Sequence, residues 1–290
     1  MTLRMGLPKG SLQNSTIDLL GKAGFRFTVG SRSYVPTCDD PEIAALLIRA
    51  QEIPRYVQDG VLDCGITGYD WIRETNADVA QMCELLYSRG GQNAVKIVCA
   101  APNDSNIQSV ADLAGKRIAT EYVGLTEQWL KEHGIEDAHV EFSWGATEVK
   151  APELVDAIVE LTETGRSLKA NGLRIVATLI ESTTRFIANR QSVQDPEKKR
   201  KIESMTMLLT GALRAETMVG LKMNVPVAKL QDVTNVLPAL KRPTVSPLAD
   251  GEWVAVETII DEKIVRILIP ELKRAGAEGI VEYPLNKVIP

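Results

Sequence analysis

Short apolar runs alternate with amphipathic segments through the first two thirds of the chain. Residues 3–7 and 63–68 have the length and the glycine boundaries of strands, and residues 96–101 form a third apolar run. Residues 12–20 carry an apolar stripe typical of a helix, which Gly24 is expected to end. Strands that alternate with helices in this way predict an α/β protein with largely parallel sheets.

Two further apolar segments look helical by the same criteria. Residues 41–50 (PEIAALLIRA) and the first half of residues 156–168 (DAIVELTETGRSL) contain good helix formers and are expected to be helices. Residues 195–201 (DPEKKRK) open another helix, and their charges predict a solvated helix face.

In the last third of the chain, apolar and polar residues alternate with period two, as in strands with one solvated face. Such strands are expected at residues 218–225 and 253–260, and the chain is expected to end in a strand at 279–283. A helix over residues 227–240 and a second one before the final strand complete two β-α-β passes, which predict a small ferredoxin-like module. Pro270 is expected to kink or end that second helix.

Composition narrows the class of protein. The 290 residues suffice for two or three domains, and 44% hydrophobic with 24% charged residues is typical of a globular protein. A net charge of −5 argues against a nucleic-acid partner. The opening MTLRMGLPKGSL does not resemble a secretory signal, and no run approaches the roughly 18 apolar residues of a membrane span. We therefore expect a cytoplasmic protein without a membrane partner.

The number and spacing of the histidines and cysteines argue against a histidine base, a zinc site or a disulfide framework. Only His133 and His139 occur, both beside a polar turn, so a reaction that depends on a histidine base is not expected. The cysteines have neither zinc-site nor disulfide-framework spacing, and are expected to be free thiols: Cys38, Cys64, Cys83 and Cys99.

Residues 162–167 (TETGRS) place hydroxyls, a glycine and an arginine within six positions. Because Gly165 has no Cβ, successive backbone N–H groups can converge there on an anion, and phosphate is the natural guest. Asp156 and Glu160, which precede this loop, are candidates to face a ribose or a hydrated Mg²⁺. The same residues are equally typical of a helix C-terminus with Gly165 in the left-handed conformation. The local pattern leaves both interpretations open.

Motifs spread along nearly the whole chain resemble those of the ATP phosphoribosyltransferase family, in its long form with a C-terminal regulatory domain. They occur in the family's order at 7–12 (LPKGSL), 53–57 (IPRYV), 59–68 (DGVLDCGITG), 115–120 (GKRIAT), 156–168 and 242–248 (RPTVSPL). Ser11 and Glu163 depart from the family's pattern, in which arginine and a small residue are usual. Glu160 and Ser167 replace the usual aspartate and threonine and keep the chemistry of each group.

The resemblance implies transfer of ribose 5-phosphate from phosphoribosyl pyrophosphate (PRPP) to N1 of ATP, with Mg²⁺ as cofactor bound mostly through substrate phosphates. The catalytic residues that it implies are Glu148, Asp156 and Glu160. The PRPP-binding residues that it implies are Thr162, Glu163, Thr164, Gly165, Arg166 and Ser167. The ATP-binding residues that it implies are Lys9, Gly10, Ser11 and Arg49. Lys116 is a weaker candidate for the same cleft.

The fold implied is α/β, with a two-lobed catalytic part similar to periplasmic binding proteins and a ferredoxin-like (ACT-like) regulatory domain. The expected boundaries are 1–95 and 181–211 for lobe I, 96–180 for lobe II, and 212–290 for the regulatory domain. Free histidine is the inhibitor implied, with Thr244 and Ser246 as candidate contacts, and a homo-oligomer that shifts from dimers to hexamers.

Two alternatives belong to other classes. Residues 184–186 (TRF) resemble the catalytic motif of prephenate dehydratase, an enzyme that combines a similar catalytic fold with an amino-acid-binding domain. The rest of that enzyme's signatures are missing from this sequence. A non-catalytic regulator that binds a nucleotide or an amino acid on the same fold is the other alternative, because fold does not fix function.

Overall fold

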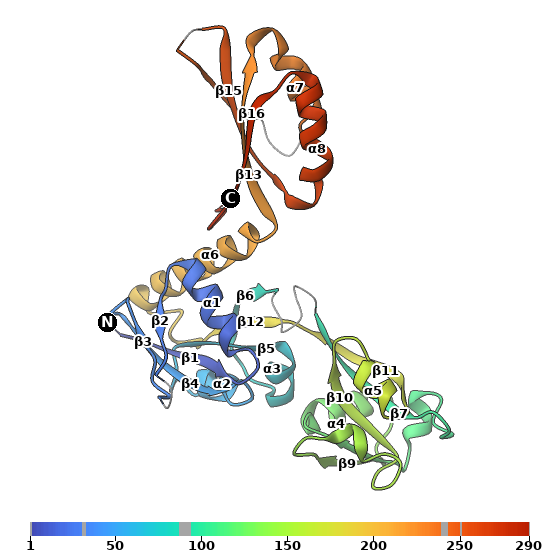
Figure 1. The fold of residues 1–290 in the computed structure, drawn as a ribbon. Coiled ribbons are helices and arrows are strands. Elements are labelled where there is room, and N and C mark those ends of the chain that lie inside the picture. Colours follow the sequence, from blue (N-terminus) through green and yellow to red (C-terminus); the bar gives the residue numbers. More distant parts are fainter. Residues whose placement is uncertain (1, 31–32, 87–93, 239–242, 250, 290) are drawn as a thin grey trace. The chain divides into compact units, whose positions relative to one another are not determined.

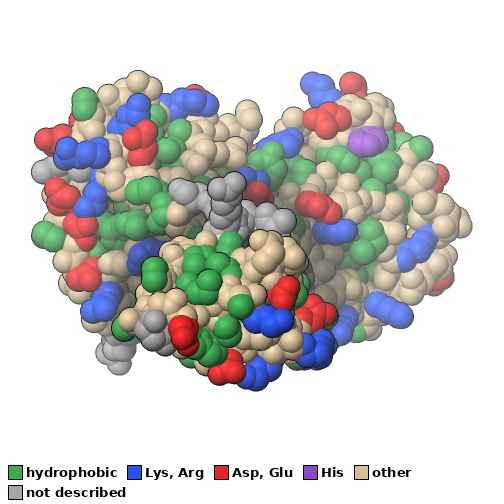
Figure 2. Space-filling view, turned by 90° about the horizontal axis from the view of Figure 1, so that it is seen from above, with side chains coloured by type: hydrophobic (Ala, Val, Ile, Leu, Met, Phe, Trp, Pro, Cys, Tyr) green, Lys and Arg blue, Asp and Glu red, His purple; other side chains and the backbone are tan. Residues whose placement is uncertain are grey.

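The computed structural model describes residues 2–30, 33–86, 94–238, 243–249 and 251–289. The chain forms two compact units, Met1–Thr206 and Met207–Pro290 (Figure 1). Among the residues drawn in colour in Figure 2, basic and acidic side chains are interspersed rather than segregated by sign. None of the helices in the described part of the chain is long and apolar enough to cross a bilayer.

The first unit contains two five-stranded sheets, each the centre of a lobe. Lobe I has the strand order β4 (Ile43–Arg49), β1 (Leu3–Lys9), β5 (Cys64–Gly68), β12 (Thr184–Ala188) and β6 (Ala80–Leu85). β4, β1 and β5 are parallel, so their carboxyl ends meet at one edge of the sheet. The helices of this lobe are α1 (Gln13–Ala23), α2 (Ile53–Gln58) and α3 (Tyr69–Thr75), and a small ribbon joins β2 (Phe27–Thr28) to β3 (Thr37–Cys38). α1 ends at Gly24 in the left-handed conformation, as predicted.

Lobe II has the strand order β11 (Leu173–Ser182), β7 (Val95–Pro102), β10 (Ala157–Thr162), β8 (Arg117–Thr120) and β9 (His139–Phe142). Its helices are η1 (Val110–Leu113), α4 (Val123–Glu132), η2 (Thr147–Val149) and α5 (Arg166–Ala170). The chain passes between the lobes twice, from β6 to β7 and from β11 to β12 (Figure 1). This two-lobed α/β architecture confirms the fold class that the sequence predicted.

Two segments expected to be helices are strands. Residues 43–49 form β4, in which Ile43, Ala45 and Leu47 are buried on alternate positions. Residues 157–162 form β10, the central strand of the second sheet. A central strand is buried on both faces and reads as a continuous apolar run, which periodicity cannot separate from a helix.

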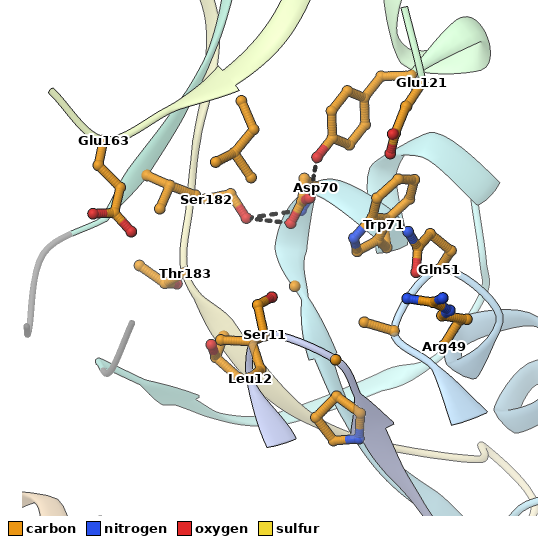
Figure 3. A pocket seen from close by; sticks show the side chains of 18 of the residues that line it. Ser11, Leu12, Arg49, Gln51, Asp70, Trp71, Glu121, Glu163, Ser182 and Thr183 are labelled. Atoms are coloured by element: carbon orange, nitrogen blue, oxygen red, sulfur yellow. Dashed lines mark hydrogen bonds between the residues drawn. The ribbon is translucent and has the colours of Figure 1, made fainter. Parts of the chain in front are cut away.

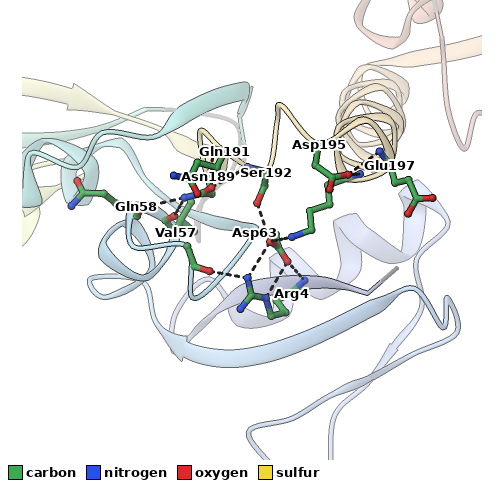
Figure 4. A network of polar contacts seen from close by, with 11 residues as sticks. Arg4, Val57, Gln58, Asp63, Asn189, Gln191, Ser192, Asp195 and Glu197 are labelled. Atoms are coloured by element: carbon green, nitrogen blue, oxygen red, sulfur yellow. Dashed lines mark hydrogen bonds and ion pairs between the residues drawn. The ribbon is translucent and has the colours of Figure 1, made fainter.

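A polar network ties the start of α6 (Pro196–Ala215) to lobe I through Asp63, which is 1% exposed (Figure 4). The Asp63 carboxylate accepts hydrogen bonds from the Arg4 backbone and guanidinium, from Ser192 Oγ at 2.9 Å and from Lys198 Nζ at 2.8 Å. Burial opposes the charge of Asp63, but these donors prevail and hold its pKa well below the usual range. The predicted solvated face of α6 is therefore wrong at Lys198. It is also wrong at Lys201, which pairs with Asp40.

The second unit is a four-stranded antiparallel sheet in the order β14 (Thr244–Pro247), β15 (Trp253–Asp261), β13 (Met218–Pro226) and β16 (Glu278–Pro284). The connections η3 (Val227–Lys229) with α7 (Leu230–Val236), and α8 (Glu262–Ala275), complete the predicted ferredoxin-like order. Residues 239–242 of the expected helix and regulatory motif lie outside the described residues. α8 continues past Pro270, so this proline does not end it. The buried stripe of Val265, Leu268 and Leu272 explains why packing outweighs the lost hydrogen bond.

Candidate active site

A cavity of about 860 Å³ lies between the two lobes of the first unit (Figure 3). Lobe I contributes the carboxyl ends of β1, β4 and β5, through residues 8–12, 49–51, Gly68, Asp70 and Trp71. Lobe II contributes Glu121, Tyr122, Glu160, Leu161 and Glu163, and the crossing segments add Leu86, Val95, Ser182, Thr183 and Thr184. Parallel strands direct their carboxyl ends to one edge, which is where α/β folds place ligands.

Basic and small residues line the lobe I wall of the cavity. All four residues expected at ATP, namely Lys9, Gly10, Ser11 and Arg49, lie there together. The Lys9 ammonium is 3.4 Å from the centroid of the Tyr34 ring, a cation–π contact that restricts where the ammonium can lie. Gly10 has φ of 110°, which side chains rarely adopt, so this turn after β1 requires glycine.

Acidic residues occupy the opposite wall. Burial raises the pKa of Glu160 and of Glu121 above the ordinary glutamate value. Glu160 Oε1 accepts a hydrogen bond from the Leu161 amide at 3.0 Å, and the Thr147 side chain also bonds the carboxyl group. These contacts hold the carboxyl group at the carboxyl end of β10, where it faces the cavity.

The hydroxyl-rich loop between β10 and α5 is held by internal hydrogen bonds. The Gly165 amide donates to Thr162 Oγ1 at 2.8 Å, and Ser167 Oγ donates to Glu148 Oε1 at 2.6 Å. Gly165 has φ of 71° and precedes α5, so it starts a helix and does not end one. The interpretation of this loop as a helix C-terminus is therefore wrong.

Only Glu163 of the loop lines the cavity. Glu148 and the other expected PRPP residues do not line it: Thr162, Thr164, Gly165, Arg166 and Ser167. The loop nevertheless lies at the end of β10 directly after Glu160 and Leu161, which do line the cavity.

Asp156 lies far from the cavity. Its carboxylate accepts a hydrogen bond from the Arg117 amide at 2.8 Å, and it lines a separate cavity of about 320 Å³ together with Lys116. In a helix, residues 156 and 160 would share one face, but in a strand four residues span about 13 Å. The structure therefore separates Asp156 from Glu160, and the catalytic role expected for Asp156 does not fit its position.

Several polar residues of the cavity wall were not predicted from the sequence, among them Asp70, Glu121, Tyr122 and Ser182. Asp70 and Tyr122 each lie two residues after a motif, those at 59–68 and 115–120. That adjacency was the available signal, because motifs at strand ends commonly continue into ligand-facing turns.

The two expected histidine contacts lie in the second unit. Thr244 and Ser246 are exposed on the edge strand β14, opposite Glu257 and Ala255 of β15. Cross-strand partners share one face of a sheet, so these side chains all belong to the same face.

The described residues include no group of three metal-ligating side chains that could hold an ion. Glu121 and Glu160 are two half-buried glutamates that line the same cavity, and the negative charge of Glu121 adds to the rise in the pKa of Glu160. One or two carboxylates together with ligand phosphates are the ordinary environment of Mg²⁺. The cavity thus fits an Mg²⁺ ion that arrives with a phosphorylated ligand.

Comparisons with known proteins agree on one family. The model of the family ATP phosphoribosyltransferase matches residues 49–211, and that of the HisG C-terminal domain matches residues 215–287. The ATP phosphoribosyltransferase of Chlorobium chlorochromatii is 61% identical over 99% of this chain and 97% of its own length. That of Pelotomaculum thermopropionicum is 57% identical over all of both chains. The structure of the ATP phosphoribosyl transferase (HisG:HisZ) complex from Thermotoga maritima aligns at a TM-score of 0.60 and 27% identity, covering 72% of this chain and 98% of that one.

Proposed function

The chain belongs to the ATP phosphoribosyltransferase family, and from this premise we propose how its cavity carries out the reaction. As a member it is a pentosyltransferase of the first step of histidine biosynthesis. It transfers ribose 5-phosphate from PRPP to N1 of ATP and releases pyrophosphate. The prephenate dehydratase and non-catalytic alternatives have no support in these comparisons. One observation carries the assignment of roles, namely a cavity with Lys9 and Arg49 on one wall and Glu160 on the other.

ATP and the pyrophosphate of PRPP are assigned to the lobe I wall. Lys9 and Arg49 supply positive charge, and the glycine turn at Gly10 lets backbone approach a phosphate closely. Ser11 adds a hydroxyl where the family's usual arginine would add another cation. The contact of the Lys9 ammonium with the Tyr34 ring restricts the position of this charge.

The 5-phosphate of PRPP is assigned to the loop of residues 162–167, with Glu148 orienting Ser167 Oγ through their hydrogen bond. The ribose then lies over the end of β10, within reach of Glu160. The proximity of the loop to Glu160 along one strand end supports this placement. Asp156 has no role in it.

The chemistry requires no histidine base. The bond from ribose C1 to pyrophosphate breaks with its electron pair leaving on the pyrophosphate, and the N1 lone pair of adenine forms the new bond to C1. Positive charge develops on the ribose, where the Glu160 carboxylate stabilises it, while Lys9 and Arg49 stabilise the departing negative charge. Closure of two lobes around the substrates excludes water and protects PRPP from hydrolysis.

Mg²⁺ is the proposed cofactor, held mainly by substrate phosphates, with the Glu121 and Glu160 carboxylates as the available protein ligands. When bound, it neutralises charge on the pyrophosphate leaving group. The assigned reaction is tested by mass spectrometry of a mixture of protein, PRPP, ATP and Mg²⁺. A product with the mass of phosphoribosyl-ATP is expected. Conversion of PRPP to ribose 5-phosphate and pyrophosphate without that product would overturn the assignment.

Free histidine is proposed as a feedback inhibitor that binds the second unit and shifts the enzyme from dimers to hexamers. The paired positions of Thr244 and Ser246 on one sheet face support a polar amino-acid site there. A cytoplasmic location and the absence of nucleic-acid and membrane partners complete the proposal, in agreement with the net charge of −5.

Replacing Thr244 by valine and Ser246 by alanine in the full-length chain is expected to raise the histidine concentration for half inhibition by at least about 10-fold. Each lost hydrogen bond in a polar site contributes roughly 1 kcal/mol, or about 5-fold in affinity. Activity without histidine should stay unchanged, because both residues lie in the unit without the cavity. Inhibition assays at several histidine concentrations measure this. An unchanged inhibition curve would remove these two residues from the histidine site.

A further inference from the structure

A buried carboxylate joins the two lobes at the edge of the cavity. Asp70 belongs to α3 of lobe I and is 3% exposed. Its Oδ2 accepts a hydrogen bond from the Tyr122 hydroxyl of lobe II at 2.9 Å, and its Oδ1 accepts one from Ser182 Oγ at 2.6 Å. Ser182 ends β11, one of the two segments that cross between the lobes. Figure 3 shows the side chains of Asp70 and Ser182 pointing toward one another at the wall of the cavity.

We infer that Asp70, Tyr122 and Ser182 form an inter-lobe clasp that sets the separation of the two cavity walls, and that they are positioning residues for the transfer reaction. The inference rests on the proposed function for its catalytic consequence only. The contacts that hold the lobes together do not depend on it.

Neighbouring contacts also join the two lobes. The rings of Trp71 and Tyr122 stack across the lobes with centroids 4.6 Å apart. One turn along α3, the Glu74 carboxylate accepts hydrogen bonds from the Gly124 and Leu125 amides at 3.0 and 2.8 Å, at the start of α4. The two helices of different lobes are thereby joined at two levels.

Local packing leaves Asp70 little freedom. A Cβ added at Gly68 would lie 2.1 Å from Asp70 Oδ1, so the strand end and the carboxylate fit together only because residue 68 is glycine. The Asp70 amide also donates to Ser182 Oγ at 2.9 Å, so the Ser182 hydroxyl is held by both the backbone and the side chain of Asp70.

Buried polar groups give the clasp its strength. A carboxylate taken out of water requires donors, and the hydroxyls of Tyr122 and Ser182 supply them. Burial, and then the charge of Asp70, raise the pKa of Tyr122 above its ordinary value, so its hydroxyl keeps the proton that it donates. Separation of the lobes would leave Asp70 without its Tyr122 donor.

Loss of the clasp should affect the reaction because the two walls of the cavity belong to different lobes. Lys9 and Arg49 lie in lobe I, whereas Glu160 lies in lobe II. A displacement of reacting groups by about 1 Å is enough to cost on the order of 100-fold in rate. Because the clasp joins the lobes beside the cavity, its loss should lower kcat more than it raises KM.

The test replaces Tyr122 by phenylalanine, which keeps the ring stacked on Trp71 and removes only the donor. Two quantities are measured on the full-length chain, namely kcat for pyrophosphate release and hydrogen exchange of the Gly124 and Leu125 amides. These amides bond across the lobes to Glu74 and therefore report on the lobe contact. Tyr283→Phe is the matched control, because it likewise removes a tyrosine hydroxyl bonded to a carboxylate, that of Glu257 in the other unit.

We expect Tyr122→Phe to accelerate exchange of these two amides and to lower kcat, each by about 10-fold, the usual value of a hydrogen bond to a charged group. Exchange within β7 should not change, and the control should change neither quantity. The Tyr122→Phe, Asp70→Ala double variant should be no slower than Asp70→Ala alone, because alanine already removes the acceptor of the Tyr122 hydrogen bond.

Unchanged exchange at Gly124 and Leu125 would overturn the clasp, whatever the activity. A lower kcat with unchanged exchange would instead make Tyr122 a residue that contacts substrate directly. If the wild-type chain releases no pyrophosphate, the proposed function fails. The exchange measurement still decides the clasp in that case, so the two failures are distinguishable.

Discussion

Replacing Glu160 by glutamine is expected to lower kcat for pyrophosphate release by about 100-fold, the usual loss when one preorganised group that stabilises transition-state charge is removed. Glutamine has the same size as glutamate and can still accept a hydrogen bond from the Leu161 amide. The change therefore removes the negative charge opposite the ribose and little else. Steady-state kinetics with both substrates varied measure the effect. The affinity for ATP should change less than kcat.

The pH dependence of this effect has a defined sign. Burial raises the pKa of Glu160 above the ordinary value of 4.5. The carboxylate must be ionised to stabilise positive charge, so the advantage of wild type over Glu160→Gln should shrink as the pH falls through that raised pKa. Glu136→Gln is the control, because Glu136 is exposed and does not line the cavity. A Glu160→Gln variant with wild-type kcat at neutral pH would exclude the catalytic role of Glu160.

Asp63→Asn is expected to lower the free energy of unfolding of the first unit by about 3 kcal/mol, the size of effect seen when one partner of a buried ion pair is removed. The variant leaves Arg4 and Lys198 without their shared carboxylate and directs an amide donor at them. Urea unfolding followed by tryptophan fluorescence measures the loss. Asp78→Ala is the control: its ion pair with Arg190 has both side chains more than half exposed, so a change below about 0.5 kcal/mol is expected.

Acid should reduce the difference between wild type and Asp63→Asn. Because the folded pKa of Asp63 is depressed, its contribution to stability is fully present above the unfolded value of about 3.9. It is lost as the pH falls below that value toward the folded pKa. A difference that stayed constant between neutral pH and strong acid would show that the Asp63 charge does not stabilise the fold.

The parts of the fold that were predictable are those whose periodicity is unambiguous. The ferredoxin-like unit has antiparallel strands with one face packed on helices, so β13 and β15 alternate in sequence as they do in space. β4 and β10 were not predictable from periodicity. Ala and Leu are strong helix formers and mask the alternation in β4, and β10 is buried on both faces.

The site was predictable where its residues are close in sequence. Lys9, Gly10 and Ser11 follow one strand, and Arg49 ends its neighbour, so motif and topology place them together. Asp156 was misplaced because a segment taken for a helix is a strand. The contacts of Asp70 join residues 52 and 112 positions away, and only the folded chain brings such residues together.

The phosphoribosyl transfer assigned to the cavity is tested by measuring the release of pyrophosphate by the full-length chain with PRPP, ATP and Mg²⁺. We expect release that requires both substrates and falls when free histidine is added. Release from PRPP alone would contradict it, because the cavity would then be hydrolysing PRPP without transfer to ATP. No release at all would contradict it as well, and would show that Ser11 and Glu163 have removed the family's activity from this chain.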